Sequence, residues 1–494
     1  MGLGASLFKD CGEQPLTKEV DQKNGKKSDK RQKAIDKLEA WQKVADQFTS
    51  ELLDEAYLHL PLRGNIIEAA SLYPSDLPEH PGLMPGTHKH LGGAYDPTDG
   101  CIYGVPAHSK AILCIHPTES GDYKMTTIPL PERIVNQQYK WLRGIVAHGY
   151  LWAIPSWADS VLCVDLDAYW GRRALPEGQT DVVTLIPLPE EHPKDMTWQW
   201  HGAAMNKEKT AIYCIPSNAE KVLKVDVATK TTSLIDIEYD AAKYPDFKVS
   251  VTNKWYGGIP GDDNAVYGVP YRAAGVLRID SVDDTAKLIG PNYGIGKYFW
   301  HGGIKVNGKI YAHPSHADTV LTIDTSEEKR GEIVELPIHR ASYDTDTRTN
   351  YKWLGGNVGA DGNIYCPACD TSAILKINVT TDHCETMGFA GKEKNKWQGG
   401  ILGRDNCIYC IPANGVQVCR IATDPSIKGD NPVQLLGKLP AHKDKWQGAS
   451  VGKDGSLYFI PENGHRVMRV TPPEKAPTIV DGKLPENDVK IELL

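Results

Sequence analysis

Residues 397–412 read WQGGILGRDNCIYCIP, and this stretch decides the fold. A tryptophan and a glycine pair open it, a polar turn follows, and apolar residues then alternate around a tyrosine up to a proline. Alternation with a period of two predicts β-strands on either side of a tight turn and excludes a repeat of helices. The same phrase, in the general form W-x-G-G, D-G, x-I-Y-x-x-P and V-L-x-I-D, recurs through most of the chain.

The recurrence defines the length of one unit. Eight copies follow one another from residue 88, at intervals of 44 to 59 residues. His90 opens the degenerate first copy, and the later copies begin at Trp141, Trp200, Trp255, Trp300, Trp353, Trp397 and Trp446. A period of about 50 residues with four short strands matches one propeller blade. We therefore predict an all-β chain that forms an eight-bladed β-propeller over 88–494, with seven blades as the alternative if the first unit is irregular.

Each unit is expected to hold four strands, named a to d in chain order. Strand a is the glycine-rich run after the tryptophan, residues 407–411 exemplify strand b, and residues 222–226 exemplify strand c. Strand d is predicted at 127–130, 185–188, 333–336 and, in the last unit, 478–480. In an antiparallel unit the a–b turn and the end of strand c share one face. The b–c loops and the starts of strand a must then share the opposite face.

The order of a D-G turn, a strand of type I/V-Y/W and a following V-x-x-I/F-D resembles the NHL, streptogramin-lyase-like and SMP-30-like repeats, over about residues 88–484. The resemblance implies a β-propeller, a fold that hosts many unrelated functions. It leaves open an enzyme of the lactonase or streptogramin-lyase kind. Such an enzyme would hold a divalent metal at the mouth of the channel, with His201, His301 and His316 among the ligands.

Composition excludes other classes of protein. Hydrophobic residues make up 40% of the 494 residues, which is typical of an ordered globular chain. The formal net charge of -8 argues against nucleic acid as a partner. Eleven cysteines without a framework spacing indicate a reducing compartment. We therefore expect a cytoplasmic protein that binds no nucleic acid.

Features that every unit carries are expected to serve the scaffold. The repeated tryptophan is predicted to pack between neighbouring blades, and the glycine pair to let the innermost strands approach closely. Aspartates of the a–b turns and of the ends of strand c, such as Asp99, Asp361, Asp454 and Asp165, are predicted to be solvated turn residues that make one face acidic.

Features that single units carry are the candidates for a binding site. The b–c loops PSWAD, PSNAE and PSHAD differ at one open position, filled by Trp157, Asn218 and His316, and Arg272 is a candidate for the same position in PYRAA. Histidines near the glycine pairs and in the last b–c loop complete the set: His90, His201, His301 and His465. No catalytic set emerges from the spacing. We predict no cofactor, with a divalent metal as the alternative.

The first 87 residues lack the repeat. Met1 to Ser6 fit the pattern for myristoylation of Gly2, and Cys11 offers a site for palmitoylation. Seven Lys and Arg against two Asp between residues 23 and 37 would add attraction to an anionic leaflet. We expect a flexible, lipidated, basic segment over 1–27, an amphipathic helix over 28–60 and a linker over 61–87 that packs on the propeller.

These features predict a non-enzymatic β-propeller scaffold. Its N-terminus would attach it peripherally to the cytosolic leaflet of a eukaryotic membrane, and its variable face would receive a protein partner. The metal-dependent lactonase or lyase remains the alternative.

Overall fold

The computed structural model describes residues 84, 86–247, 251–342, 344, 350–423, 432–477, 484–485 and 488–494. The predicted lipidated segment, with Gly2 and Cys11, the predicted helix and most of the predicted linker lie outside these residues. Within the described ranges, no helix is long and apolar enough to cross a membrane. The helices there are two single turns, α3 (Glu132–Val135) and α4 (Leu166–Tyr169).

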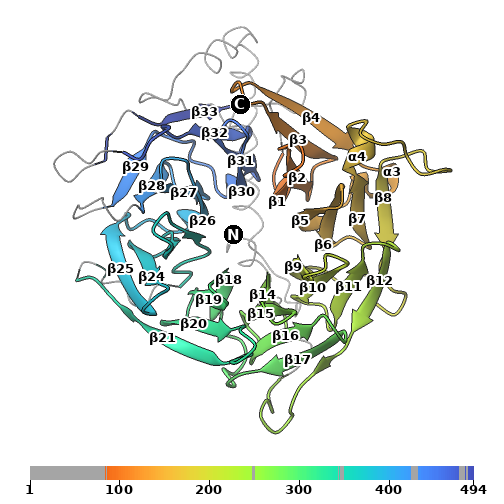
Figure 1. Cartoon of the computed structure of the whole chain (residues 1–494), viewed down its shortest axis with the longest axis horizontal. Helices are drawn as coiled ribbons and strands as arrows, with labels where there is room; N and C mark the ends of the chain where they lie inside the picture. Colours follow the sequence, from red (N-terminus) through yellow and green to blue (C-terminus); the bar gives the residue numbers. More distant parts are fainter. Residues whose placement is uncertain are drawn as a thin grey trace, which may run out of the picture.

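Antiparallel sheets follow one another around a ring, and the first strand of each lies nearest the centre, as in a β-propeller (Figure 1). The first three units form β1 (His90–Tyr95), β2 (Ile102–Pro106), β3 (Ala111–Pro117) and β4 (Tyr123–Pro129); β5 (Trp141–Ala147), β6 (Tyr150–Pro155), β7 (Ser160–Asp165) and β8 (Val183–Pro187); and β9 (Trp200–Met205), β10 (Ala211–Pro216), β11 (Val222–Asp226) and β12 (Thr231–Ile235). The fourth and fifth form β14 (Trp255–Pro260), β15 (Ala265–Pro270), β16 (Val276–Asp280) and β17 (Thr285–Ile289); and β18 (Trp300–Val306), β19 (Lys309–Pro314), β20 (Thr319–Asp324) and β21 (Ile333–His339). The sixth, seventh and eighth form β22 (Asn357–Val358), β23 (Ile364–Cys366), β24 (Ala373–Asn378) and β25 (His383–Phe389); β26 (Trp397–Leu402), β27 (Cys407–Pro412), β28 (Val418–Ala422) and β29 (Val433–Leu436); and β30 (Trp446–Val451), β31 (Leu457–Pro461), β32 (Met468–Thr471) and β33 (Lys490–Leu493).

Short parallel pairings link neighbouring sheets at their outer edges. The two-residue strand β13 (Ile237–Glu238) follows the third unit and pairs with β17 of the fourth. The end of β21 pairs in the same way with β25, so the fifth and sixth sheets are hydrogen-bonded into one. The strand β13 and the end of β21 therefore extend beyond their own units and join neighbouring sheets at the outer edge of the ring.

The predicted strands a, b and c agree with the observed ones, and β11 spans the predicted residues 222–226. The predicted strand d of the last unit is wrong. Its position at 478–480 lies outside the described residues, and the strand that pairs with β32 is β33, at the C-terminus. Ile491 of β33 is buried in the core, and Glu492 lies 3.6 Å from Arg469 of β32. The burial of Ile491 and the ion pair of Glu492 with Arg469 hold β33 in the sheet of the last unit.

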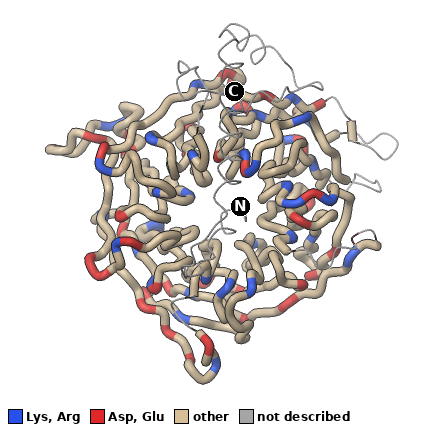
Figure 2. Tube along the Cα trace, turned by 180° about the vertical axis from the view of Figure 1, so that it is seen from behind, with Lys and Arg blue, Asp and Glu red and all other residues tan. Residues whose placement is uncertain are grey.

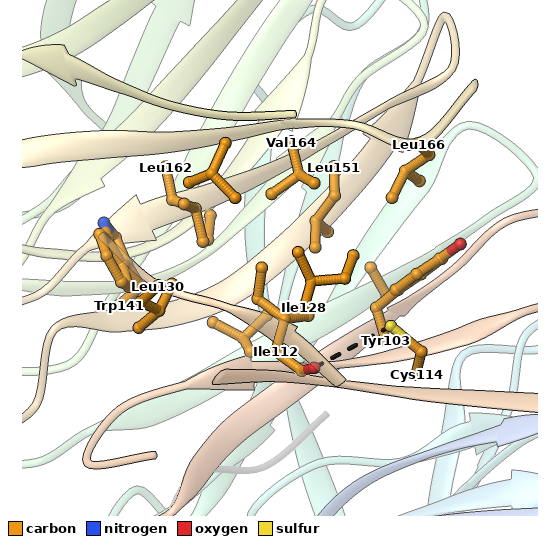
Figure 3. Packing of buried hydrophobic residues seen from close by; sticks show 14 of the residues in the cluster. Tyr103, Ile112, Cys114, Ile128, Leu130, Trp141, Leu151, Leu162, Val164 and Leu166 are labelled. Atoms are coloured by element: carbon orange, nitrogen blue, oxygen red, sulfur yellow. Dashed lines mark hydrogen bonds between the residues drawn. The ribbon is translucent and has the colours of Figure 1, made fainter. Parts of the chain in front are cut away.

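The core consists of apolar layers between successive sheets. Trp141, from the start of β5, lies among Ile112 and Ile128 of the first unit and Leu151 and Leu162 of the second (Figure 3). Trp200, Trp255, Trp300, Trp353, Trp397 and Trp446 lie in the corresponding layers of later units. The prediction that the repeated tryptophan packs between neighbours is confirmed.

Each of these tryptophans also holds its own unit together. The indole N–H donates to a backbone carbonyl at the start of strand c, at 2.8 Å for Trp141 with Ser160 and 2.9 Å for Trp353 with Ala373. The same bond recurs in the five other units that carry the tryptophan, at 2.7 to 3.0 Å. The polar end of a fully buried ring is thus satisfied, as burial requires.

The expectation of solvated turn aspartates is wrong for three of the predicted residues. The side chains of Asp165, Asp361 and Asp454 are buried and face Arg or Lys. In the last unit Arg469 and the Tyr458 hydroxyl both donate to Asp454. Positive and negative residues are interspersed along the trace in Figure 2, in keeping with such pairing. Asp361 and Asp454 thereby lock their a–b turns to strands b and c, whereas Asp165 holds the segment after strand c through Arg173.

Candidate functional site

The b–c loops and the residues before each tryptophan share one face, as predicted. In the second unit the backbone N–H groups of Ser156, Trp157 and Ala158 all donate to the carbonyl of Lys140, at 2.9 to 3.3 Å. Equivalent bonds recur around the ring, for example from Cys369 to Lys352. Each loop is therefore anchored beside the start of its own innermost strand, and we call this surface the loop face.

Buried lysines fasten four of the units to the loop of the preceding one. The ammonium of Lys352 donates to the carbonyls of His316 and Ala317 at 2.9 and 3.1 Å. Burial lowers the pKa of Lys445 to about 7. Six buried lysines occupy this position, directly before the tryptophan or its replacement: Lys89, Lys140, Lys254, Lys352, Lys396 and Lys445. The position belongs to the scaffold, although its residues are ionisable.

Four loops use their open position for a clasp between units. The Asn218 side-chain oxygen accepts the backbone N–H of Asn253 in the next unit at 2.9 Å. The same bond, at 2.7 to 2.9 Å, joins Asp370 to Asn395, Asn414 to Asp444 and Asn463 to His88. The fold thus explains Asn218, one of the predicted site residues, as part of a repeated structural contact.

The other four loops lack this clasp and carry ring or guanidinium contacts in its place. Ring centroids lie 4.3 Å apart for His108 and Tyr139, 5.9 Å for Trp157 and Trp198, and 4.7 Å for His316 and Tyr351. The Arg272 guanidinium lies 5.2 Å from the Tyr298 ring centroid. We call these eight half-buried residues the aromatic rim. It contains the predicted residues Trp157, Arg272 and His316.

Three aromatic residues of the rim adopt an unfavourable backbone conformation. Tyr139, Trp198 and Tyr351 have φ values of 46°, 52° and 53°, in the left-handed region. Asn and Asp tolerate this region, and they occupy the same position in three of the four units that keep the clasp, with His88 in the fourth. A bulky aromatic residue there is an outlier that persists only where something compensates its strain. This conformation marks the rim as a candidate for function.

A second group of side chains lies further in. His201, Tyr256 and His301 are the second residues of β9, β14 and β18. His201 stacks on Tyr256 with ring centroids 3.7 Å apart, and His301 meets Tyr256 edge-on at 4.9 Å. Tyr271, in the position where related loops have serine, stacks on the other side of Tyr256 at 4.2 Å. With Arg143 these residues form what we call the inner cluster.

Arg143 occupies a position that favours glycine. It is the first residue of the glycine pair in β5, where seven other units have Gly92, Gly202, Gly257, Gly302, Gly355, Gly399 and Gly448, all with positive φ. Arg143 adopts a φ of 63° and stores the steric cost of a left-handed side chain. The sequence analysis missed it, although an arginine in the glycine slot is visible in the repeat.

The inner cluster is rich in hydrogen-bond donors. Burial and the positive charge of Arg143 hold the pKa values of His201 and His301 well below the usual range, so both imidazoles are neutral. Burial raises the pKa of Tyr256, and removal from water lowers that of Arg143 to about 10, which leaves it charged at neutral pH. The Nδ1 atoms of His201 and His301 are buried without a hydrogen-bond partner among the described residues.

The alternative metal set is not assembled. The rings of His201 and His301 lie 6.2 Å apart, whereas His316 belongs to the rim and contacts Tyr298 and Tyr351. In the part of the chain that the structure describes, no group of three or more His, Cys, Asp or Glu could hold a metal ion. The inner cluster brings together two of the three predicted histidines, with phenol and guanidinium groups in place of a third ligand.

The two remaining predicted histidines lie where the last unit meets the first. His90 Nδ1 is 3.1 Å from the carbonyl of Pro461, and burial lowers its pKa to about 3. His465 contacts His442 with ring centroids 5.1 Å apart. His90 thus replaces the tryptophan of other units with a contact that helps to close the ring.

A pH dependence of stability follows from His313 in β19. Burial lowers its pKa from 6.5 to about 3, and six other units have Val or Ile at this position. The unfolded chain binds the proton first, so the stability held by neutral His313 is complete above pH 6.5 and is lost as the pH falls toward 3. Between pH 6.5 and 5 the loss is about 2 kcal/mol.

Replacing His313 by isoleucine should remove this term. Thermal unfolding of the chain and of His313→Ile between pH 4 and 7.5 measures it. We expect Tm to fall more steeply with acid in the native chain than in His313→Ile. Parallel curves would show that His313 does not titrate in this way.

Comparison with known proteins gives structural matches only. No family model matches the chain, and no curated protein sequence matches it. A streptogramin B lyase structure is 16% identical, with a TM-score of 0.44 over 84% of this chain and 97% of that chain. Virginiamycin B lyase from Staphylococcus aureus is 11% identical, with a TM-score of 0.44 over 84% and 98%. Apo AztD from Citrobacter koseri is 12% identical, with a TM-score of 0.42 over 72% and 87%. These low sequence identities and TM-scores give no information about the chemistry of this chain.

Proposed function

We propose that this chain is an eight-bladed β-propeller that binds a protein partner on its loop face. The inner cluster takes a carboxylate of the partner, and the aromatic rim grips the apolar side chains next to that carboxylate. The observation that carries the proposal is Arg143, a charged residue held in left-handed backbone where the repeat otherwise has glycine. Strain that the scaffold does not need is expected at a functional site.

An anionic group fits the inner cluster best. Arg143 supplies a permanent positive charge, and guanidinium matches the planar geometry of a carboxylate. The neutral imidazoles of His201 and His301 each have a buried Nδ1 without a hydrogen-bond partner among the described residues, and this atom donates in the tautomer that carries its proton there. Tyr256 stays protonated at neutral pH because burial raises its pKa. A carboxylate would accept hydrogen bonds from both imidazoles beside the positive charge of Arg143.

A protein partner fits the aromatic rim. Trp, Tyr and Arg dominate the energetic centres of protein interfaces, and Trp and Tyr bury large area there with little loss of conformational freedom. The rim combines these residue types with histidine on one face of the ring. At four positions an aromatic or basic residue stands where the other four loops form the clasp hydrogen bond.

Binding is favoured over acid–base catalysis. A general base works best with a pKa near the working pH. The imidazoles of His201 and His301 have pKa values well below this range, and the phenol of Tyr256 has one well above it. The cluster therefore keeps one protonation state around neutral pH, which suits a fixed recognition site.

The eight-bladed form rests on the eight copies of the repeat and on four strands in each. Attachment to the cytosolic leaflet of a membrane rests on the myristoylation pattern at Gly2, the basic run behind it and Cys11. A myristoyl adduct on the N-terminal peptide of the native protein would support the anchor. An unmodified Gly2 would overturn it.

Peptide selection tests the binding site. We would select displayed random peptides against the full chain and rank the enriched sequences. The proposal expects an acidic residue beside proline or aromatic residues in the binders, and it expects binding to depend on Arg143. Binders that lack an acidic residue and bind the Arg143→Gly variant as tightly would overturn it.

A further inference from the structure

One position of the repeat recurs at the inner end of the loop face. It is the residue directly after the repeated tryptophan, or after His90 in the first unit. In the first two units this residue packs beside Ala107 of a b–c loop, and in the sixth it packs against Cys369 of another. Around the ring the position is filled by Leu91, Leu142, His201, Tyr256, His301, Leu354, Gln398 and Gln447. The position thus supplies three members of the inner cluster and places Gln447 in the same layer.

Gln447 buries a carboxamide without a partner. The residue is 2% exposed, and neither its Oε1 nor its Nε2 atom has a hydrogen-bond partner among the described residues. A buried donor or acceptor that stays unpaired costs free energy, so native structures rarely retain one. The fold does not require a polar residue here, because three units carry leucine at the same position. Gln447 therefore indicates a ligand that pairs with its carboxamide.

The matching glutamine of the seventh unit shows what Gln447 lacks. Gln398 Nε2 donates to Asn395 Oδ1, three residues earlier, at 2.7 Å. Asn395 in turn donates to Asp444 of the eighth unit at 3.1 Å. Asp444 stands three residues before Gln447, so the eighth unit has a carboxylate where the seventh has an amide. The scaffold uses Gln398 in a chain of hydrogen bonds that, among the described residues, does not include Gln447.

Gln447 is close to the cationic part of the inner cluster. A Cβ atom placed on Gly448 would lie 3.4 Å from Gly92 Cα, and one placed on Gly92 would lie 3.5 Å from Arg143 Cγ. Gly92 therefore puts no side chain between Arg143 and the strand that carries Gln447. A ligand that reaches from Arg143 to Gln447 crosses the first unit only.

We propose that Gln447 binds a peptide group of the partner's main chain, next to the acidic residue that the inner cluster holds. A carboxamide carries an acceptor oxygen and two donor hydrogens, which match the N–H and C=O groups of a peptide. The partner is then bound in one direction, with its carboxylate at Arg143 and its main chain toward Gln447. This inference rests on the proposed function, because it assigns a second contact to the same partner.

Ester substitution in a bound peptide tests the contact. An ester replaces the N–H of one peptide bond by oxygen and leaves every side chain in place. The probe is the tightest peptide selected on the full chain, made with an ester at each peptide bond in turn. We expect one ester to weaken binding to the native chain about tenfold, and Gln447→Leu to weaken the unsubstituted peptide to a similar degree. In Gln447→Leu the same ester should change the affinity by less than about twofold.

Gln398→Leu is the matched control, because the amide of Gln398 is already paired within its own unit. It should leave the affinity and the effect of each ester unchanged. Thermal unfolding separates a ligand contact from a structural one. Gln447→Leu should raise Tm, because it removes an unpaired buried amide, whereas Gln398→Leu should not. A lower Tm of Gln447→Leu, or an ester effect that persists in this variant, would overturn the inference.

The outcome is distinguishable from that of the proposed function. Binding that depends on Arg143 but on no ester would support the partner site and contradict the contact with Gln447. An ester effect that requires Gln447, in a peptide that binds Arg143→Gly as tightly, would support the peptide-group contact and contradict the carboxylate site. A selection without binders, or binding that depends on neither residue, would contradict both.

Discussion

Replacing Arg143 by glycine should raise the stability of the protein and strongly weaken its affinity for the partner. Glycine is the residue of the seven equivalent positions, and it adopts positive φ without the steric cost of about 1 to 2 kcal/mol that a side chain carries there. Unfolding free energy should rise by about 1 kcal/mol. Loss of a buried charged contact should weaken a selected peptide about a hundredfold, by a cost of roughly 2 to 5 kcal/mol.

Calorimetric titration and thermal unfolding of three variants separate these effects. Arg143→Ala loses the guanidinium and keeps the strain, so it should lose binding without the gain in Tm. Arg272→Ala alters the rim alone and should weaken binding about tenfold with little change in Tm. An Arg143→Gly variant that binds normally, or that unfolds at a lower temperature, would show that Arg143 serves the scaffold.

Replacing Arg420 by alanine should cause the largest loss of stability. Arg420 and Asp405 are both fully buried, and Arg420 Nε donates to the carboxylate at 3.1 Å. Arg420 also donates to Asp488 at 2.9 Å, which ties the C-terminal segment to the seventh unit. Removing one partner leaves a buried carboxylate without its cation, at a cost of about 3 to 5 kcal/mol.

Denaturant unfolding of Arg420→Ala and Arg133→Ala measures this cost. Arg133 pairs with Asp159 on the surface, where both side chains are about half exposed, so its loss should cost at most about 1 kcal/mol. Replacing Asp405 and Arg420 together by apolar residues should recover much of the loss, because no charge is then stranded. Equal effects of the two single arginine variants would contradict the account.

Repetition made most of the fold predictable. Eight copies of one phrase located the tryptophans, and the alternation after each glycine pair located strands a and b. The last strand d was misplaced because 490–493 follow a long interval after strand c and lack the turn that precedes other copies. The burial of Asp361 and Asp454 depends on a cationic side chain from strand c, a contact that the D-G pattern does not show.

The candidate site was only partly predictable. His201, His301 and Trp157 stood out because they interrupt the repeat. Asn218 stood out in the same way, yet it forms a clasp with the next unit that no single unit can reveal. Rim residues such as Trp198 lie two positions before the repeated tryptophan, outside the phrase that defined the repeat. Comparing residues that flank a motif would have found them.

The central claim is that the inner cluster receives the partner. An NMR spectrum of the full chain with ¹⁵N-labelled histidine, recorded with and without a selected peptide, tests it directly. The Nδ1 signals of His201 and His301, assigned by their loss in His201→Ala and His301→Ala, should shift when the peptide saturates the protein. The signal of the exposed His148 should stay in place. Unchanged signals of His201 and His301 at saturation would contradict the account.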